Sequence, residues 1–318
     1  MNPEALAQAR KREALDHALG EAVLGALADP MVVEVMANPD GHVVIDRLGR
    51  GRADAGIQLT APARERVIRL VADYVDEPIT REDPRRSGVL PTGARFQGFL
   101  PPVCAQAAFA IRKRPTVIWT LDAYVKSEVM SEPQAAMLRQ AVRDRRNILI
   151  SGGAGSGKTT LANAVLAEPD FVGDRVFLIE DTPELQCSAW DLVAVLTRRH
   201  PKPITVADLV RDALRMRPDR IVVGEMRDGA AALEALKAWN TGHPGGVSTI
   251  HANSAPEALT RLEDLLLEVV ASPPKRMIAQ AVDVIVHITR TREGRAVETV
   301  LDLQGLDEVK GYVVRRAA

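Results

Sequence analysis

The sequence predicts an α/β protein with a mostly parallel sheet, preceded by a smaller α+β domain. Three observations support this prediction. A short apolar run at 148–150 stops at the glycine-rich stretch 152–157, and a helical stretch then begins at Lys158. Beyond it, strand-like apolar runs alternate with helical stretches, the pattern of parallel strands joined by right-handed crossovers. Residues 1–115 instead mix helical stretches with strand pairs around turns, which is typical of an α+β domain.

Length and composition limit the class of protein. With 318 residues, the length prior suggests about two domains. Hydrophobic residues make up 46% and charged residues 26%, which is ordinary for a soluble globular protein. The 41 Lys and Arg nearly balance the 42 Asp and Glu, so tight non-specific nucleic-acid binding by the whole chain is not expected, although a local basic patch stays open. No apolar run approaches the ~20 residues of a membrane span, and the amino-terminal stretch lacks the apolar core of a signal peptide.

Apolar periodicity and turn residues place the elements of the first domain, which we expect over 1–115. Residues 3–28 show the spacing of one or two amphipathic helices, broken by Asp29 and Pro30. The remaining elements are a helix at 61–75, strands at 31–36, 42–46, 95–101 and 105–111, a Gly- and Arg-rich turn at 49–52 and a charged loop at 81–91.

A linker with a short helix is expected over 116–132, and the second domain over 133–318. Helices are predicted at 134–143, 205–216, 229–239, 254–270 and 275–282, in addition to the one at Lys158. Strands are predicted at 148–150, 175–179, 220–223, 247–251, 283–289, 296–303 and 312–314. In such a parallel sheet, ligands bind at the carboxyl ends of the strands.

A phosphate-binding loop is the clearest motif. Gly152, Gly157, Lys158 and Thr159 match its fixed positions, with a strand before them and a helix after them. Glycines let the backbone curl around a polyphosphate, and the helix N-terminus favours the negative charge. Lys158 is expected at the β- and γ-phosphates and the Thr159 hydroxyl on Mg²⁺. The residues expected to bind ATP are Gly152, Gly153, Ala154, Gly155, Ser156, Gly157, Lys158, Thr159 and Thr160.

Polar side chains follow three other predicted strands at the point where each strand ends. Glu180 and Asp181 follow one, Glu225 follows another, and His251 ends a third. Because the carboxyl ends of parallel strands share one edge of the sheet, we expect these side chains to converge on the phosphate-binding loop.

Each of these carboxylates has a catalytic and a structural interpretation. Glu225 is assigned to the Mg²⁺ shell or to orienting the attacking water, because Gly224 replaces the Asp that many phosphate-loop enzymes carry there. Glu180 and Asp181 could hold and polarise a metal-bound water, with Asp181 as a metal ligand. The alternatives are a surface Glu225 and a stretch 181–184 that only caps a turn.

His251 and two arginines complete the candidate site. A neutral His251 could sense the γ-phosphate and relay its presence to a neighbouring subunit, but a histidine after an apolar run is often only packed. Arg95 and Arg112 lie near the ends of two strands in the first domain. Arginines supplied from elsewhere commonly neutralise a transferring phosphoryl group, and the alternative is that both are solvated surface residues.

Four stretches taken together resemble a known family, the secretion and traffic ATPases of type IV secretion, conjugation and pilus systems. They are Gly152–Thr160, Ile179–Leu185, Arg215–Arg227 with Gly224 and Glu225, and Thr241–His243 with Ser248–Ala255. The resemblance is strong over about 90–270, and residues 34–41 look most like the conjugal-transfer members.

The resemblance implies a Mg²⁺-dependent ATPase that forms a hexameric ring. It implies a small PAS-like amino-terminal domain tied flexibly to a RecA-like domain, with ATP bound between the two. Arg95, in the stretch 93–96, and Arg112, in the stretch 109–112, match the arginines that complete such a site. Members act as peripheral proteins at the cytoplasmic face of the inner membrane, where they power the apparatus and the passage of DNA or protein.

Other functions stay open at this point. A ring-shaped DNA helicase or translocase would share the core but needs a basic channel with aromatic residues, which the 3% aromatic content and balanced charge do not favour. A type II secretion or pilus motor is a related alternative. A regulatory scaffold with little hydrolysis would have no need for both Lys158 and Glu225, and a small-molecule kinase would not explain the four matching stretches.

Overall fold

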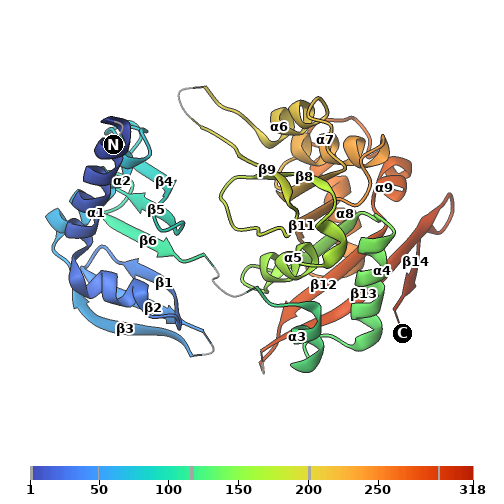
Figure 1. Cartoon of the computed structure of the whole chain (residues 1–318), viewed down its shortest axis with the longest axis horizontal. Helices are drawn as coiled ribbons and strands as arrows, with labels where there is room; N and C mark the ends of the chain where they lie inside the picture. Colours follow the sequence, from blue (N-terminus) through green and yellow to red (C-terminus); the bar gives the residue numbers. More distant parts are fainter. Residues whose placement is uncertain (1–2, 49, 115–117, 200–201, 293, 318) are drawn as a thin grey trace. The chain divides into compact units, whose positions relative to one another are not determined.

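The computed structural model describes all residues except 1–2, 49, 115–117, 200–201, 293 and 318 (Figure 1). The chain divides into two compact units, Met1–Thr116 and Val117–Ala318, and each is described here by itself. No helix among the described residues combines the length and the apolar character needed to cross a bilayer.

The first unit is one antiparallel sheet with two helices. Its strand order is β3-β2-β1-β6-β5-β4, and every neighbouring pair is antiparallel. The strands are β1 (Val32–Ala37), β2 (His42–Arg47), β3 (Gly51–Gln58), β4 (Arg85–Val89), β5 (Arg95–Phe99) and β6 (Ala108–Arg112). The helices are α1 (Pro3–Ala28), which is interrupted at Gly20, where φ is 75°, and α2 (Ala61–Tyr74). One apolar core joins α1, α2 and the sheet.

A buried arginine ties the parts of this unit together. Arg64, on α2, is 1% exposed, and its guanidinium donates to three backbone carbonyl groups and to Gln106. The distances are 2.7 Å to the oxygen of Ala107 and 2.6 Å to that of Pro39. Because a buried cation is costly without partners, these bonds hold the helix, the turn before β2 and the loop before β6 in one arrangement.

The second unit is an eight-stranded sheet with the order β14-β13-β12-β7-β11-β10-β8-β9. The six strands from β12 to β9 are parallel, and β13 and β14 are antiparallel additions. The strands are β7 (Ile148–Gly152), β8 (Arg175–Glu180), β9 (Asp191–Leu196), β10 (Arg220–Glu225), β11 (Val247–His251), β12 (Val284–Arg290), β13 (Arg295–Asp307) and β14 (Gly311–Arg316). The predicted mostly parallel α/β sheet is confirmed.

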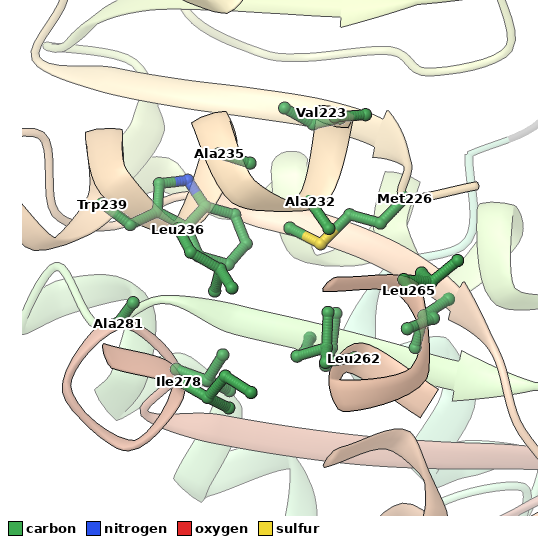
Figure 2. Close-up of a cluster of buried hydrophobic side chains, with 14 of the residues drawn as sticks. Val223, Met226, Ala232, Ala235, Leu236, Trp239, Leu262, Leu265, Ile278 and Ala281 are labelled. Atoms are coloured by element: carbon green, nitrogen blue, oxygen red, sulfur yellow. The ribbon is translucent and has the colours of Figure 1, made fainter. Parts of the chain in front are cut away.

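Helices cover both faces of this sheet, which is why the central strands are continuously apolar. One face packs against α6 (Val206–Ala213), α7 (Gly229–Asn240), α8 (Ala255–Leu266) and α9 (Lys275–Ala281). The other packs against α3 (Leu121–Lys126), α4 (Glu132–Arg143), α5 (Lys158–Leu166) and the short helix η1 (Pro169–Phe171). Figure 2 shows part of the core between the sheet and helices α6 to α9, where Leu236 and Trp239 of α7 approach Ile278 of α9.

One contact in this core joins a helix to a central strand. The indole Nε1 of Trp239 donates to the backbone oxygen of Ile221 on β10 at 3.0 Å. A Cβ at Gly246 would clash with this indole, so only glycine leaves room for the bond.

The structure differs from the sequence prediction at three sheet edges. The short helix predicted within 116–132 is present as α3, and its Leu121 and Tyr124 are buried in the core of the second unit. The turn predicted at 49–52 begins strand β3, the loop predicted at 81–91 contains β4, and β9 was not predicted. All three are edge strands. β3 and β4 lack an apolar run, whereas β9 contains one at 192–196 that the sequence interpretation passed over.

Candidate functional site

The phosphate-binding loop follows β7 without interruption. Residues 152–157 connect the strand to α5, and Lys158, Thr159 and Thr160 form the first turn of the helix. A Cβ at Gly152 would clash with the backbone oxygen of Ile288 and lie 2.5 Å from Ser156 Oγ, so this position requires glycine. Gly155 and Gly157 have φ values of 68° and 105°, which side chains rarely adopt. The loop therefore has the tight curl that its sequence predicts.

Lys158 is held inside the loop. Its side chain is 7% exposed, and Nζ donates to the backbone oxygens of Gly152 and Gly153, both at 3.0 Å. Nζ also lies 3.2 Å from Nδ1 of His251. Burial lowers the pKa of Lys158, and the charge of Glu225 opposes this effect. The ammonium group is thus kept at the loop by neutral partners that a polyphosphate could replace.

His251 connects Lys158 to Glu225. While Nδ1 faces the ammonium group, Nε2 lies 2.9 Å from Oε1 of Glu225. An ammonium group can only donate, so Nδ1 accepts and Nε2 donates to the carboxylate. The three residues form one polar chain across the ends of β11 and β10, beside the loop.

Glu180 is buried at the end of β8 and holds the turn that follows it. Its Oε1 accepts from the backbone N–H groups of Glu184 and Leu185, both at 2.9 Å. A Cβ at Gly224 would lie 3.0 Å from Cγ of Glu180. The ends of β8 and β10 thus approach closely at Gly224, which stands where many phosphate-loop enzymes carry an aspartate. The sequence alternative was a cap provided by the stretch 181–184, but in the structure the carboxylate that accepts from this turn belongs to Glu180.

Arg227 is a site residue that the sequence interpretation missed. Its Nη1 donates to Oδ2 of Asp181 at 2.9 Å, and its Nε donates to Glu225. Asp181 also accepts from the Thr197 hydroxyl at 2.8 Å. Asp181 thus contacts Arg227 and reaches Glu225 only through it. A cation two positions after a carboxylate at a strand end was the signal that could have identified Arg227.

The predicted arginines Arg95 and Arg112 lie together in the first unit. They face each other directly as an antiparallel pair on β5 and β6. Arg112 is exposed and Arg95 is half-buried. On the other side of β6, Glu34 of β1 is in register with Arg112, so a carboxylate accompanies the arginine pair in the same row of the sheet.

The strand order accounts for the convergence in the second unit. Glycine 152, His251, Glu225 and Glu180 end four consecutive strands, β7, β11, β10 and β8. Among the residues that the structure describes, no group of three or more His, Cys, Asp and Glu side chains could hold a metal ion by itself.

A comparison with protein families decides the affiliation. Residues 92–311 match the family described as "Type II/IV secretion system protein". The chain belongs to this family. The chain is 49% identical over 293 residues to the probable conjugal transfer protein TrbB of Sinorhizobium fredii, covering 91% of this chain and 89% of that protein. It is 48% identical over 297 residues to the conjugal transfer protein TrbB of Rhizobium radiobacter, covering 92% and 90%.

A solved structure supports the same architecture. The pilus retraction motor PilT with bound ADP matches with a TM-score of 0.62 at 20% identity, covering 94% of this chain and 82% of that one. At this identity the similarity concerns the fold alone. The RecA-like fold that the family resemblance implied, preceded by a smaller α+β unit, is confirmed.

The polar chain predicts how His251 titrates in the protein without nucleotide or Mg²⁺. Its side chain is 54% exposed, yet its pKa lies below 6.5 because of burial and then the Lys158 charge, while Glu225 opposes them. Removing the cation in Lys158→Met should raise the pKa of His251, and removing the anion in Glu225→Gln should lower it further. A pH titration by NMR, with the resonance assigned from His251→Gln, checks both directions. An identical pKa in all three proteins would contradict the contact.

Proposed function

We propose that this chain is a Mg²⁺-dependent ATPase that powers conjugative DNA transfer or type IV secretion. The observation that carries the proposal is the chain Lys158–His251–Glu225, which lies beside a phosphate-binding loop at the ends of parallel strands. Its membership of the secretion family and its similarity to conjugal transfer proteins support the same conclusion.

The loop supplies the binding energy for the triphosphate. Backbone N–H groups of residues 152–160 and the N-terminus of α5 favour phosphate oxygens. In our proposal, Lys158 exchanges the carbonyls of Gly152 and Gly153 for the β- and γ-phosphates. The Thr159 hydroxyl would hold Mg²⁺ in its inner shell, with Glu225 and Asp181 holding its water ligands. The ion would neutralise charge on the phosphates.

Glu225 is proposed to orient the water that attacks the γ-phosphate. Its carboxylate is fixed from two sides, by His251 and by Arg227, which leaves it pointing in a defined direction. Glu180 keeps the neighbouring turn in place and could hold a water through its carboxylate. When the γ-phosphate draws Lys158 away, His251 loses its ammonium partner, which gives His251 its proposed role as the sensor of bound nucleotide.

Arg95 and Arg112 are proposed to complete the site from the amino-terminal domain, 1–115. The two arginines lie directly opposite each other on β5 and β6, so a single triphosphate could contact both of them. In this proposal ATP binds between the amino-terminal domain and the RecA-like domain.

The finer biological role rests on the family. We propose that six copies form a ring at the cytoplasmic face of the inner membrane, as peripheral proteins that contact inner-membrane components of the apparatus. Direct binding of nucleic acid is not part of the proposal, because the acidic and basic residues nearly cancel at a net charge of −1.

Two substitutions separate binding from hydrolysis. Lys158→Ala should lower ATP hydrolysis by a factor of about 100 or more and weaken ATP binding, because the phosphate contact is lost. Glu225→Gln should reduce hydrolysis similarly while ATP still binds, because only the orientation of water changes. Phosphate release and calorimetric binding of ATP with Mg²⁺ measure both. Normal hydrolysis by Lys158→Ala would refute the ATPase assignment, and loss of ATP binding in Glu225→Gln would make Glu225 a structural or metal-binding residue.

The two arginines provide a second test. Arg95→Ala and Arg112→Ala should each reduce hydrolysis by at least about tenfold, because transition-state charge is left without a partner. Arg52→Ala is the matched control, since Arg52 is an exposed arginine on β3 of the same sheet. The same steady-state assay applies. Equal rates for all three variants would show that the arginine pair has no catalytic role.

Ring formation is tested by imaging the full chain in negative stain, with and without a non-hydrolysable ATP analogue. We expect rings of six copies, more compact when the analogue is bound. If only single chains are seen under both conditions, the proposed ring is wrong. Nucleotide-dependent unwinding of duplex DNA by such rings would instead favour the helicase alternative.

A further inference from the structure

The flank of the phosphate-binding loop away from Glu225 holds an arginine with no role so far. Cδ and Nε of Arg295, the first residue of β13, lie 3.0 Å and 3.3 Å from where a Cβ would project from Gly157. Ile288 of β12 lies beside it, with Cδ1 at 3.4 Å from the same point. The guanidinium group of this exposed side chain is therefore next to the residue that precedes Lys158.

The hairpin that carries Arg295 extends past the loop. On β12, His287 is in register with Ser151 of β7, so Ile288 is level with Gly152. Arg290, two residues further on, thus lies about 7 Å beyond that level toward the carboxyl edge. Arg290 pairs directly with Arg295, so both belong to the face of the sheet that α5 covers.

The strand order fixes which end of a triphosphate faces this hairpin. Glu225 and His251 lie on the β11 and β10 side of β7, whereas β12 and β13 lie on its other side. The γ-phosphate has to be near Lys158 and Glu225 for the proposed reaction. The nucleoside end of the same molecule is then directed toward β12 and Arg295.

The side chain of Arg295 suits a flat aromatic ring. Burial raises the pKa of Tyr124, and the nearby charge of Arg295 opposes that rise. Among the described residues, which leave out Glu293, no carboxylate pairs with Arg290, Arg292 or Arg295. A guanidinium group is planar and weakly hydrated, and it stacks readily on an aromatic face.

We propose that Arg295 binds the base of the nucleotide, with its guanidinium group stacked on the ring, and so positions the nucleoside end beside Gly157. This inference rests on the proposed ATPase function and adds the part of the ligand that the loop does not contact. Arg290 lies opposite and keeps the local potential positive.

The test compares a ligand that has a base with one that has none. Calorimetry of the full chain with ATP and with inorganic tripolyphosphate, both with Mg²⁺, gives the two affinities. Arg295→Gln should lower the affinity for ATP roughly tenfold, the size expected for one lost stacking contact, and should change the affinity for tripolyphosphate by no more than about twofold. Arg295→Lys keeps the charge without the planar group and should restore only part of the ATP affinity.

Arg292→Gln, in the same hairpin, is the matched control and should leave both affinities unchanged. Unchanged ATP binding in Arg295→Gln would overturn the inference. It would also be overturned if Arg295→Gln lowered the affinity for both ligands equally, or if Arg292→Gln had the same effect as Arg295→Gln. Either result would mean that the positive charge of the hairpin, and not stacking on the base, affects binding. A wild-type chain that binds neither ligand would overturn the proposed function together with this inference.

Discussion

The parallel pairing of β7 with β11 and β12 is the constraint on which the site depends. This pairing places Gly152 level with His251 on one side and with Ile288 on the other. The loop consequently emerges between two strand ends, with acidic and imidazole groups on one flank and arginines on the other. Interior pairing of this kind cannot shift by one residue without turning the apolar side chains of β7 from one core to the other.

The central part of the second unit could be predicted from the sequence because burial on both faces leaves continuous apolar runs. Leu149, Val222 and Ile250 are all fully buried, and each lies in a strand that the sequence predicts. The three missed strands, β3, β4 and β9, are edges of the two sheets. In β3 and β4, polar and glycine residues replace the apolar pattern, and β4 contains two arginines and a glycine within five residues. The sequence of β9 is apolar at 192–196, so this strand could have been predicted.

The site could be predicted in outline but not in its internal contacts. The convergence of Lys158, Glu225 and His251 followed from strand-end chemistry and parallel topology. That Glu180 caps a turn, and that Arg227 bridges Glu225 and Asp181, depends on side-chain directions that no periodicity encodes. Arg295 escaped notice for a related reason, since its proximity to Gly157 arises from a hairpin more than a hundred residues further along the chain.

The bond between Trp239 and Ile221 has a mechanical consequence. The indole of Trp239 bonds helix α7 to β10, the strand that ends in Glu225. Gly246 packs closely against this indole, so the side chain has little room to move. Close-packed interiors transmit displacement instead of absorbing it. A displacement of α7 would therefore also displace β10 and the Glu225 carboxylate at its carboxyl end.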